Sequence, residues 1–152
     1  MYKTIIDKLK NNCFNHYEIS NFAKKKYESK HNLNYWNNEN YYGFGLGAHG
    51  YINDIRYENT RNINKYLNGN YIYKQESLDQ KIKMENEMIL GLRKLTGVNK
   101  KVFEQKYQKT IPNVFNIDKL IKTKQLIDDG ENIYIPEDKL YISNEILLNF
   151  ID

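Results

Sequence analysis

Cysteine and long apolar runs are scarce in this sequence, and their scarcity excludes several classes of protein. The 152 residues contain one cysteine, Cys13, which excludes internal disulfides and any zinc or iron–sulfur site built from several thiolates. The longest apolar runs are as short as residues 146–148, so we expect no transmembrane segment. The first eight residues lack the apolar stretch of a secretory signal. We therefore expect a cytoplasmic protein in which Cys13 is a small buried side chain.

The excess positive charge lies in the first half of the chain. The net charge of +4 comes from 23 basic and 19 acidic residues. Up to Glu76 there are 11 basic and 7 acidic residues, whereas the remainder carries 12 of each. Nucleic-acid-binding modules usually present a distinctly basic surface. We therefore expect no nucleic-acid partner.

The sequence divides into two parts, which we expect to be two domains, residues 1–70 and 71–152. The first part is rich in aromatic residues, and four of the eight glycines lie between residues 43 and 50. Its patterns predict several short elements. These are a helix over 4–10, a strand within 14–20, a loop over 21–40, a buried strand over 41–46, a hairpin turning at 53–54, a short helix over 62–67 and a connection up to residue 76.

The second part has regular helical periodicity. A capping box at residues 77–80 predicts a helix that ends at Gly97, and Asn99 is expected to cap a second helix. A third helix starting at residue 116 or 118, a hairpin turning at 136–139 and a last helix from residue 143 complete the pattern. This is the element order of a winged-helix-like module, and it predicts an α+β fold class.

A winged-helix module invites the hypothesis of DNA binding, which we keep as an alternative of a different class. The third helix would read the DNA, and it carries Lys119, Lys122 and Lys124. It has no arginine, and acidic residues flank it. A packing or partner-docking module is therefore favoured.

Residues 45–50 match the dinucleotide-binding pattern GxGxxG letter for letter. That pattern has a physical meaning only when a helix follows, because the helix N-terminus holds the pyrophosphate. A hairpin pattern follows here, so we reject a nucleotide site. The glycines still indicate a sharp turn or the close approach of a ligand or another segment.

The three histidines, His16, His31 and His49, match no common metal-ligand spacing, which favours ordinary hydrogen-bonded side chains. The densest chemical cluster is residues 24–36, which hold four lysines, His31, Tyr35 and Trp36. A flat, doubly acidic ligand such as a porphyrin suits this set through axial ligation, stacking and lysine–propionate pairs. The alternative, favoured by composition alone, is that the aromatic residues pack a core edge and the lysines are solvated.

Four segments carry a resemblance to a known family. They are YEISNFA at 17–23, HNLNYW at 31–36, YYGFGLGAHG at 41–50 and RYENTRNINKYL at 56–67. Together they resemble the oxygen-independent coproporphyrinogen III oxidase-like radical-SAM family, and HNxxYW resembles its haem-chaperone branch. The resemblance covers essentially the whole chain. It implies the terminal piece of a partial (β/α) radical-SAM barrel in residues 1–70, followed by a small winged-helix-like accessory domain.

The resemblance also implies parts that this sequence lacks. Members of the family carry a CxxxCxxC motif whose thiolates hold a [4Fe–4S] cluster that binds S-adenosylmethionine, and this chain has one cysteine. We therefore expect Met1 to begin a fragment whose partners include the missing N-terminal half of the barrel. We expect no catalytic residues and no radical chemistry in the chain alone.

The family's functional residues are carried over where the motifs match. They are His31, Asn32, Tyr35 and Trp36 in HNLNYW, and Gly45, Gly47 and Ala48 in GFGLGAHG. The resemblance implies that the first group handles haem, with His31 as the candidate iron ligand, and that the second group lines the cofactor and substrate cavity. It implies a chaperone that binds haem or a porphyrin and delivers it to acceptor proteins. The alternative is a fragment of an oxygen-independent coproporphyrinogen III oxidase of porphyrin biosynthesis, and the role of His49 stays open.

Overall fold

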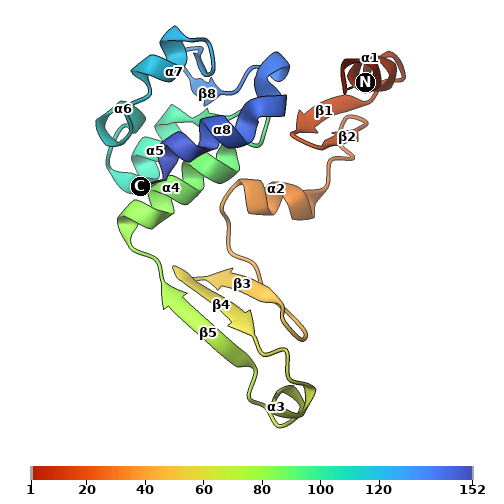
Figure 1. Cartoon of the computed structure of the whole chain (residues 1–152), viewed down its shortest axis with the longest axis vertical. Coiled ribbons are helices and arrows are strands. Elements are labelled where there is room, and N and C mark those ends of the chain that lie inside the picture. The colour runs from red at the N-terminus through yellow and green to blue at the C-terminus, as the bar shows by residue number, and fades with distance from the viewer. Residues whose placement is uncertain (1, 152) are drawn as a thin grey trace.

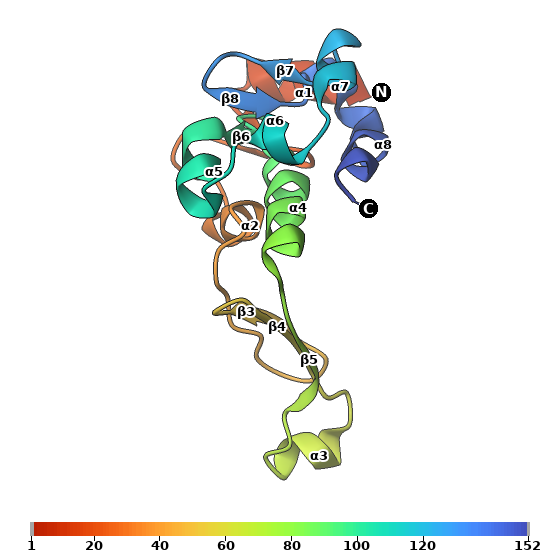
Figure 2. The same ribbon diagram turned by 90° about the vertical axis from the view of Figure 1, so that its left-hand side faces the viewer.

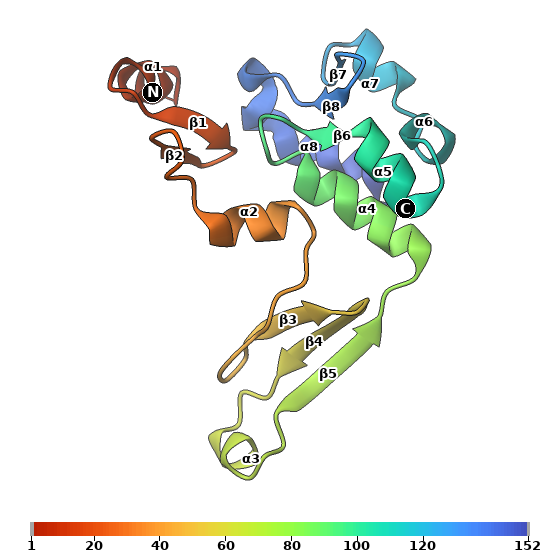
Figure 3. The same cartoon turned by 180° about the vertical axis from the view of Figure 1, so that it is seen from behind.

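The computed structural model describes residues 2–151 and shows a helical module from which a three-stranded sheet extends (Figure 1). The chain begins with two helices that flank a small antiparallel hairpin. These elements are α1 (Tyr2–Asn11), β1 (Asn15–Glu18), β2 (Asn21–Ala23) and α2 (Lys30–Trp36). Figures 1 and 3 show α2 between the hairpin and the extended sheet. The expected loop over residues 21–40 is therefore wrong, because it contains β2 and α2.

The extended sheet has the order β3-β4-β5 with antiparallel pairing throughout. Its elements are β3 (His49–Ile52), β4 (Ile55–Asn59), the helix α3 (Ile63–Leu67) and β5 (Ile72–Ser77). Figure 2 shows α3 at the end of the sheet farthest from the helical module. The predicted hairpin is confirmed: Asn53 and Asp54 have φ values of 50° and 66°, as a tight two-residue hairpin requires.

Two expectations for this region are wrong. The stretch up to residue 76 is not a connection, because β5 pairs with β4 along its length. All six residues of β5 are exposed, so the strand has no alternating apolar pattern from which it could be predicted. Residues 41–46 are not a buried strand: Tyr41 makes one isolated bridge to Tyr51, and Tyr42 and Phe44 are 69% and 83% exposed.

The second part has the predicted winged-helix-like arrangement, with short helices against a three-stranded sheet of order β6-β8-β7. Its elements are α4 (Gln80–Gly91), β6 (Val98–Asn99), α5 (Lys100–Tyr107), α6 (Ile111–Val114), α7 (Asp118–Lys122), β7 (Ile127–Asp128), β8 (Asn132–Tyr134), η1 (Glu137–Ile142), α8 (Ser143–Leu147) and η2 (Leu148–Phe150). The main hydrophobic core lies here, between Met84 and Phe150. Its most buried side chains include Met88, Leu92, Phe103 and Ile133, each 0% exposed.

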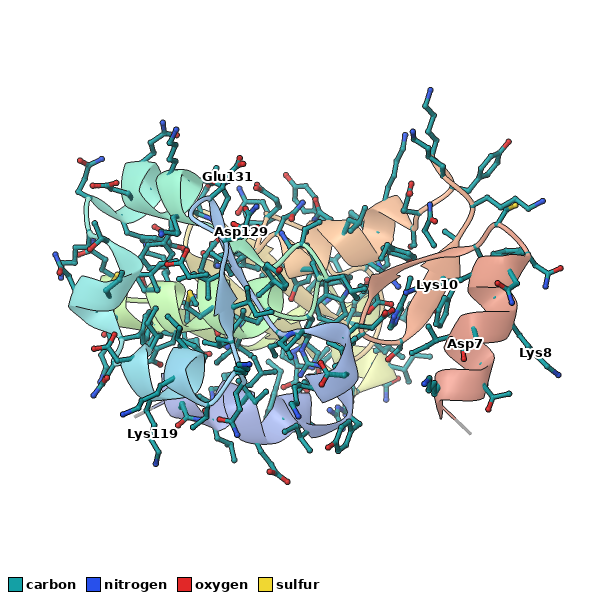
Figure 4. The ribbon with its side chains drawn as sticks, turned by 90° about the horizontal axis from the view of Figure 1, so that it is seen from above. Asp7, Lys8, Lys10, Lys119, Asp129 and Glu131 are labelled. Carbon is teal, nitrogen blue, oxygen red and sulfur yellow. The ribbon has the colours of Figure 1, made fainter. Side chains whose placement is uncertain are left out.

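Turn chemistry explains where this part departs from prediction. The hairpin turns at Asp129 rather than at residues 136–139, because the Asp129 carboxylate accepts hydrogen bonds from the backbone N–H groups of Glu131 and Asn132 at 3.0 and 2.7 Å. Figure 4 labels Asp129 and Glu131 in this turn. Residues 137–142 form the helix η1 instead of a strand. Similarly, α4 is capped by Asp79 and not by Ser77, which is the last residue of β5.

The two parts are joined by backbone hydrogen bonds as well as by the chain. Ile19 donates its N–H to the carbonyl of Arg93 at 2.9 Å, and Leu95 donates to the carbonyl of Tyr17 at 3.3 Å. The β1–β2 hairpin therefore pairs with the loop after α4. The division into domains 1–70 and 71–152 stays a prediction.

Two further features complete the fold. Cys13 is exposed at the turn after α1, so the expectation of a buried thiol is wrong. The helices within residues 2–151 are all too short or too polar to cross a bilayer.

Candidate functional site

The HNLNYW segment forms the helix α2. The Ser29 hydroxyl caps the helix by accepting the backbone N–H of Asn32 at 3.2 Å, and the Tyr17 hydroxyl accepts the N–H of Ser29 at 3.3 Å. At the other end, Lys94 donates to the Asn37 side-chain oxygen at 2.6 Å. The helix is thus fixed at both ends, although none of its residues is fully buried.

Three aromatic rings form a row that starts at His31. The His31 ring is exposed and meets Tyr35, one turn later, edge-on at a centroid distance of 4.8 Å. Tyr35 in turn contacts Tyr41 at 4.4 Å. Among the described residues, none donates a hydrogen bond to a ring nitrogen of His31 or accepts one from it. Its imidazole is therefore available to a ligand.

Trp36 faces the helical module rather than solvent. Its ring is partly buried, and the Arg93 guanidinium lies 5.4 Å from the ring centroid. Its indole Nε1 is buried without a hydrogen-bond partner. Trp36 therefore helps to hold α2 against α4, and its contact with any ligand beside His31 stays a prediction.

The glycine-rich segment is a loop held by the neighbouring sheet. The buried Asn59 donates its side-chain amide to the carbonyls of Gly43 and Gly45 at 3.0 and 2.9 Å, and its backbone N–H to Ala48 at 2.8 Å. Gly45 and Gly47 have φ values of 98° and 66°, which side chains other than glycine rarely adopt. As predicted, a strand and not a helix follows, so the loop lacks the helix N-terminus that a pyrophosphate requires.

A cavity of about 250 Å³ lies beside this loop and is lined by residues from α2, α4 and the β3–β4 hairpin. Its lining consists of Tyr35, Asn38, Glu39, Tyr41, His49, Tyr51, Arg56, Asn86 and Leu90. The structure thus brings Tyr35 and His49 together. It does not bring His31, Asn32, Trp36, Gly45, Gly47 or Ala48 to the same wall.

The surroundings of the cavity raise the pKa of two of its tyrosines, Tyr41 and Tyr51. Burial raises the pKa of Tyr41, and the nearby Tyr35 adds to this effect. Burial likewise raises the pKa of Tyr51, assisted by Asp54, whose carboxylate lies 3.2 Å from the Tyr51 hydroxyl. The positive charge of Arg56 acts in the opposite direction on both groups. The charged residues at the cavity are therefore Arg56 and Glu39, and the hydroxyl of Tyr51 is already donated to Asp54.

Sequence reasoning missed Arg56 and Asn86 as cavity residues. Arg56 lies within one of the family-like segments, but no residue next to it in the sequence marks it as part of a site. Asn86 lies 50 residues after Trp36. The packing of α2 against α4, together with the position of the β3–β4 hairpin, brings Arg56 and Asn86 to one cavity.

The histidines do not form a metal centre. Within residues 2–151 there is no group of three or more His, Cys, Asp or Glu side chains that could hold a metal ion. His16 is buried and bonded to Glu137 at 2.9 Å, as expected of an ordinary histidine. A single imidazole without a hydrogen bond, such as that of His31, suits a metal ion whose other coordination positions are already filled by a bound cofactor.

The sequence is similar over its whole length to named bacterial proteins. It is 40% identical over 156 residues to the haem chaperone HemW of Lactococcus lactis and 38% identical over 158 residues to that of Bacillus subtilis, covering 99% of this chain in each case. This chain belongs to the same family. It spans about two fifths of the length of these relatives, 41% and 42%. No protein-family model matches the sequence.

The fold matches part of a solved radical-SAM enzyme. The structure superposes on the coproporphyrinogen III oxidase HemN of Escherichia coli with a TM-score of 0.75, covering 98% of this chain and 39% of the enzyme. The match lies in the C-terminal region of that enzyme, and it confirms the predicted α+β class without a closed barrel among the described residues. The sequence identity of this pair is 15%, so the match shows the fold alone.

Proposed function

We propose that this chain is the haem-handling part of a haem chaperone, which binds haem and hands it to acceptor proteins. The observation that carries the proposal is the exposed His31 imidazole, free of hydrogen bonds and braced by Tyr35 at 4.8 Å. The name of the relatives, haem chaperone HemW, supports it. The coproporphyrinogen III oxidase alternative rests on fold likeness at 15% identity, which is a weaker ground.

Haem as cargo suits the donor set of α2. The porphyrin supplies four nitrogen ligands to iron, so the protein needs to add only an axial ligand, and one imidazole does this. The row of rings from His31 to Tyr41 offers apolar faces and edges to the macrocycle. Exposed Lys24, Lys25 and Lys26, just before α2, can pair with propionates.

The cluster and S-adenosylmethionine that the radical-SAM relationship implies do not fit the residues of this chain. A [4Fe–4S] cluster needs several thiolates, and Cys13 is the one cysteine of the sequence. We therefore propose that both groups are held by parts of the full-length protein outside this chain. No step involving them is assigned to these residues.

The test is the electronic spectrum of the haem complex. His31→Ala should shift or abolish the Soret band because that band reports the axial ligand, whereas the circular dichroism spectrum should stay that of the wild type. Trp36→Leu should weaken binding and leave the position of the band unchanged, since the aromatic contact that it removes contributes affinity but no coordination. If the band is unchanged in His31→Ala and lost in His49→Ala, the ligand is His49 and the assignment to His31 is wrong.

A further inference from the structure

The wall of the cavity between α2, α4 and β4 includes a residue with a hydrogen-bond donor that no protein group uses. The side-chain Nδ2 of Asn86 is buried and has no hydrogen-bond partner. Buried amide groups in proteins almost always find an acceptor, so an unused one at a cavity wall indicates a missing partner. The unused amide of Asn86 favours a ligand with acceptor oxygens.

Arg56 adds a positive charge to the same cavity. Its Nη1 lies 3.6 Å from a Glu76 oxygen, which is too long for a hydrogen bond, and the two side chains are 40% and 45% exposed. Such exposed pairs contribute little, so the guanidinium is free to bind another carboxylate. Glu39, the acid at the cavity, is exposed to solvent. The interior wall is therefore complementary to an anion.

The size of the cavity limits what can enter. Sites that enclose a drug-sized ligand usually measure roughly 300–1,000 Å³, and this cavity measures about 250 Å³. A porphyrin macrocycle does not fit inside, whereas a propionate arm does. Tyr35 forms part of the cavity wall, and the centroid of its ring lies 4.8 Å from that of the His31 ring. A macrocycle held by His31 therefore has one edge beside the cavity.

We propose that this cavity takes one propionate of the haem, with the Arg56 guanidinium and the Asn86 amide as its binding groups. The inference rests on the proposed function. It adds a carboxylate site, formed by β4 and α4, to the iron ligand on α2. The cavity thereby sets the orientation of the macrocycle on the helix, because a carboxylate bound by a guanidinium and an amide is held in direction as well as in place.

The experiment compares haemin with haemin dimethyl ester, in which both carboxylates are blocked, by spectrophotometric titration of the chain. Arg56→Gln and Asn86→Ala should each weaken haemin binding about tenfold, because each removes a hydrogen bond to a charged group. The position of the Soret band should not change. The ester should bind the wild type and both variants with the same affinity. Lys100→Gln is the matched control, because it removes a cation with an acidic partner, Asp128, from the other part of the chain.

The outcomes separate this inference from the proposed function. If the wild type binds haemin and its ester equally, or if Arg56→Gln and Asn86→Ala both retain wild-type affinity for haemin, the carboxylate site is wrong and the haem function stands. If the wild type binds neither compound, both proposals are wrong. Circular dichroism of the two variants excludes misfolding, and equal ester binding by variants and wild type does so independently.

Discussion

The Nδ1 atom of His16 lies 2.9 Å from a carboxylate oxygen of Glu137, which is 121 residues further along the chain. The His16 side chain is fully buried and stacks on Phe22 at a centroid distance of 4.2 Å. The second oxygen of Glu137 accepts a hydrogen bond from Lys10 at 2.6 Å, and Figure 4 labels Lys10 on α1. This three-residue group fastens the N-terminal segment to η1.

Removing the charge of Glu137 should therefore destabilise the chain. At pH 7, Glu137→Gln should lower the free energy of unfolding by about 1–3 kcal/mol, because a buried histidine loses a charged partner. The matched control is Asp138→Asn, whose side chain is 73% exposed and lies 3.6 Å from Lys139, and its effect should stay within about 0.5 kcal/mol. Urea denaturation measures both.

The effect of Glu137 should depend on pH. Partial burial pushes the pKa of Glu137 upward, but the hydrogen bonds from Lys10 and His16 outweigh burial and lower the pKa below its ordinary value of 4.5. A carboxyl whose folded pKa is depressed stabilises the protein above the unfolded pKa and loses that contribution as the pH falls through the folded pKa. The difference between wild type and Glu137→Gln should thus be full at pH 6 and shrink below pH 4.5. A difference that grows on acidification would contradict this linkage.

Gly45 should be sensitive to alanine for a reason of backbone conformation. Its φ is 98°, yet a Cβ atom there would meet nothing within 4 Å, so strain and not a clash sets the cost. Gly45→Ala should lower stability by about 1 kcal/mol and Gly47→Ala, with φ at 66° and Arg61 nearby, by at least as much. Thermal melting measures the effect.

Gly130 provides the control for this pair. It has a φ of 95° and equally open surroundings, but it lies in the turn between β7 and β8. Gly130→Ala should lower stability by a similar amount and leave haem binding unchanged. Gly45→Ala should lower both the stability and the haem affinity. Equal melting of wild type and Gly45→Ala would show that the loop does not need glycine there.

The lysines before α2 should act through long-range attraction. Changing Lys24, Lys25 and Lys26 together to glutamine should slow haemin association at low salt, because propionates lose a nearby positive charge. The difference should largely disappear near 0.15 M salt, where charges are screened over about 8 Å. The same change at Lys119, Lys122 and Lys124 is the control, and Figure 4 shows Lys119 on α7, away from α1. Stopped-flow rates that differ from wild type equally for both triple variants would rule out a local role.

Hydrogen exchange should distinguish the extended sheet from the helical module. The buried core lies between Met84 and Phe150, so amides of α4 near Met88 should exchange slowly. The sheet β3-β4-β5 has exposed side chains along β5 and should exchange faster. Uniform protection of both regions would contradict this difference in local stability between the sheet and the helical core.

The sequence by itself determined those features that depend on neighbouring residues. Asn62 and Asn99 cap α3 and α5 through their own side chains, and the Asn53–Asp54 turn has the residue types that tolerate its positive φ values. The family-like segments were recognisable for a related reason, because each is a continuous run of residues. The amphipathic helices of the second part also follow from a local period.

Only the tertiary structure decided the features that join distant residues. The strand β5 exists because its backbone pairs with β4, although its side chains have no buried face. The cavity exists because α2 packs on α4, which brings Tyr35 to Asn86, and the partner of His16 comes from η1 at the far end of the chain. Burial and hydrogen bonding between such residues depend on the whole fold, and no spacing within the sequence encodes them.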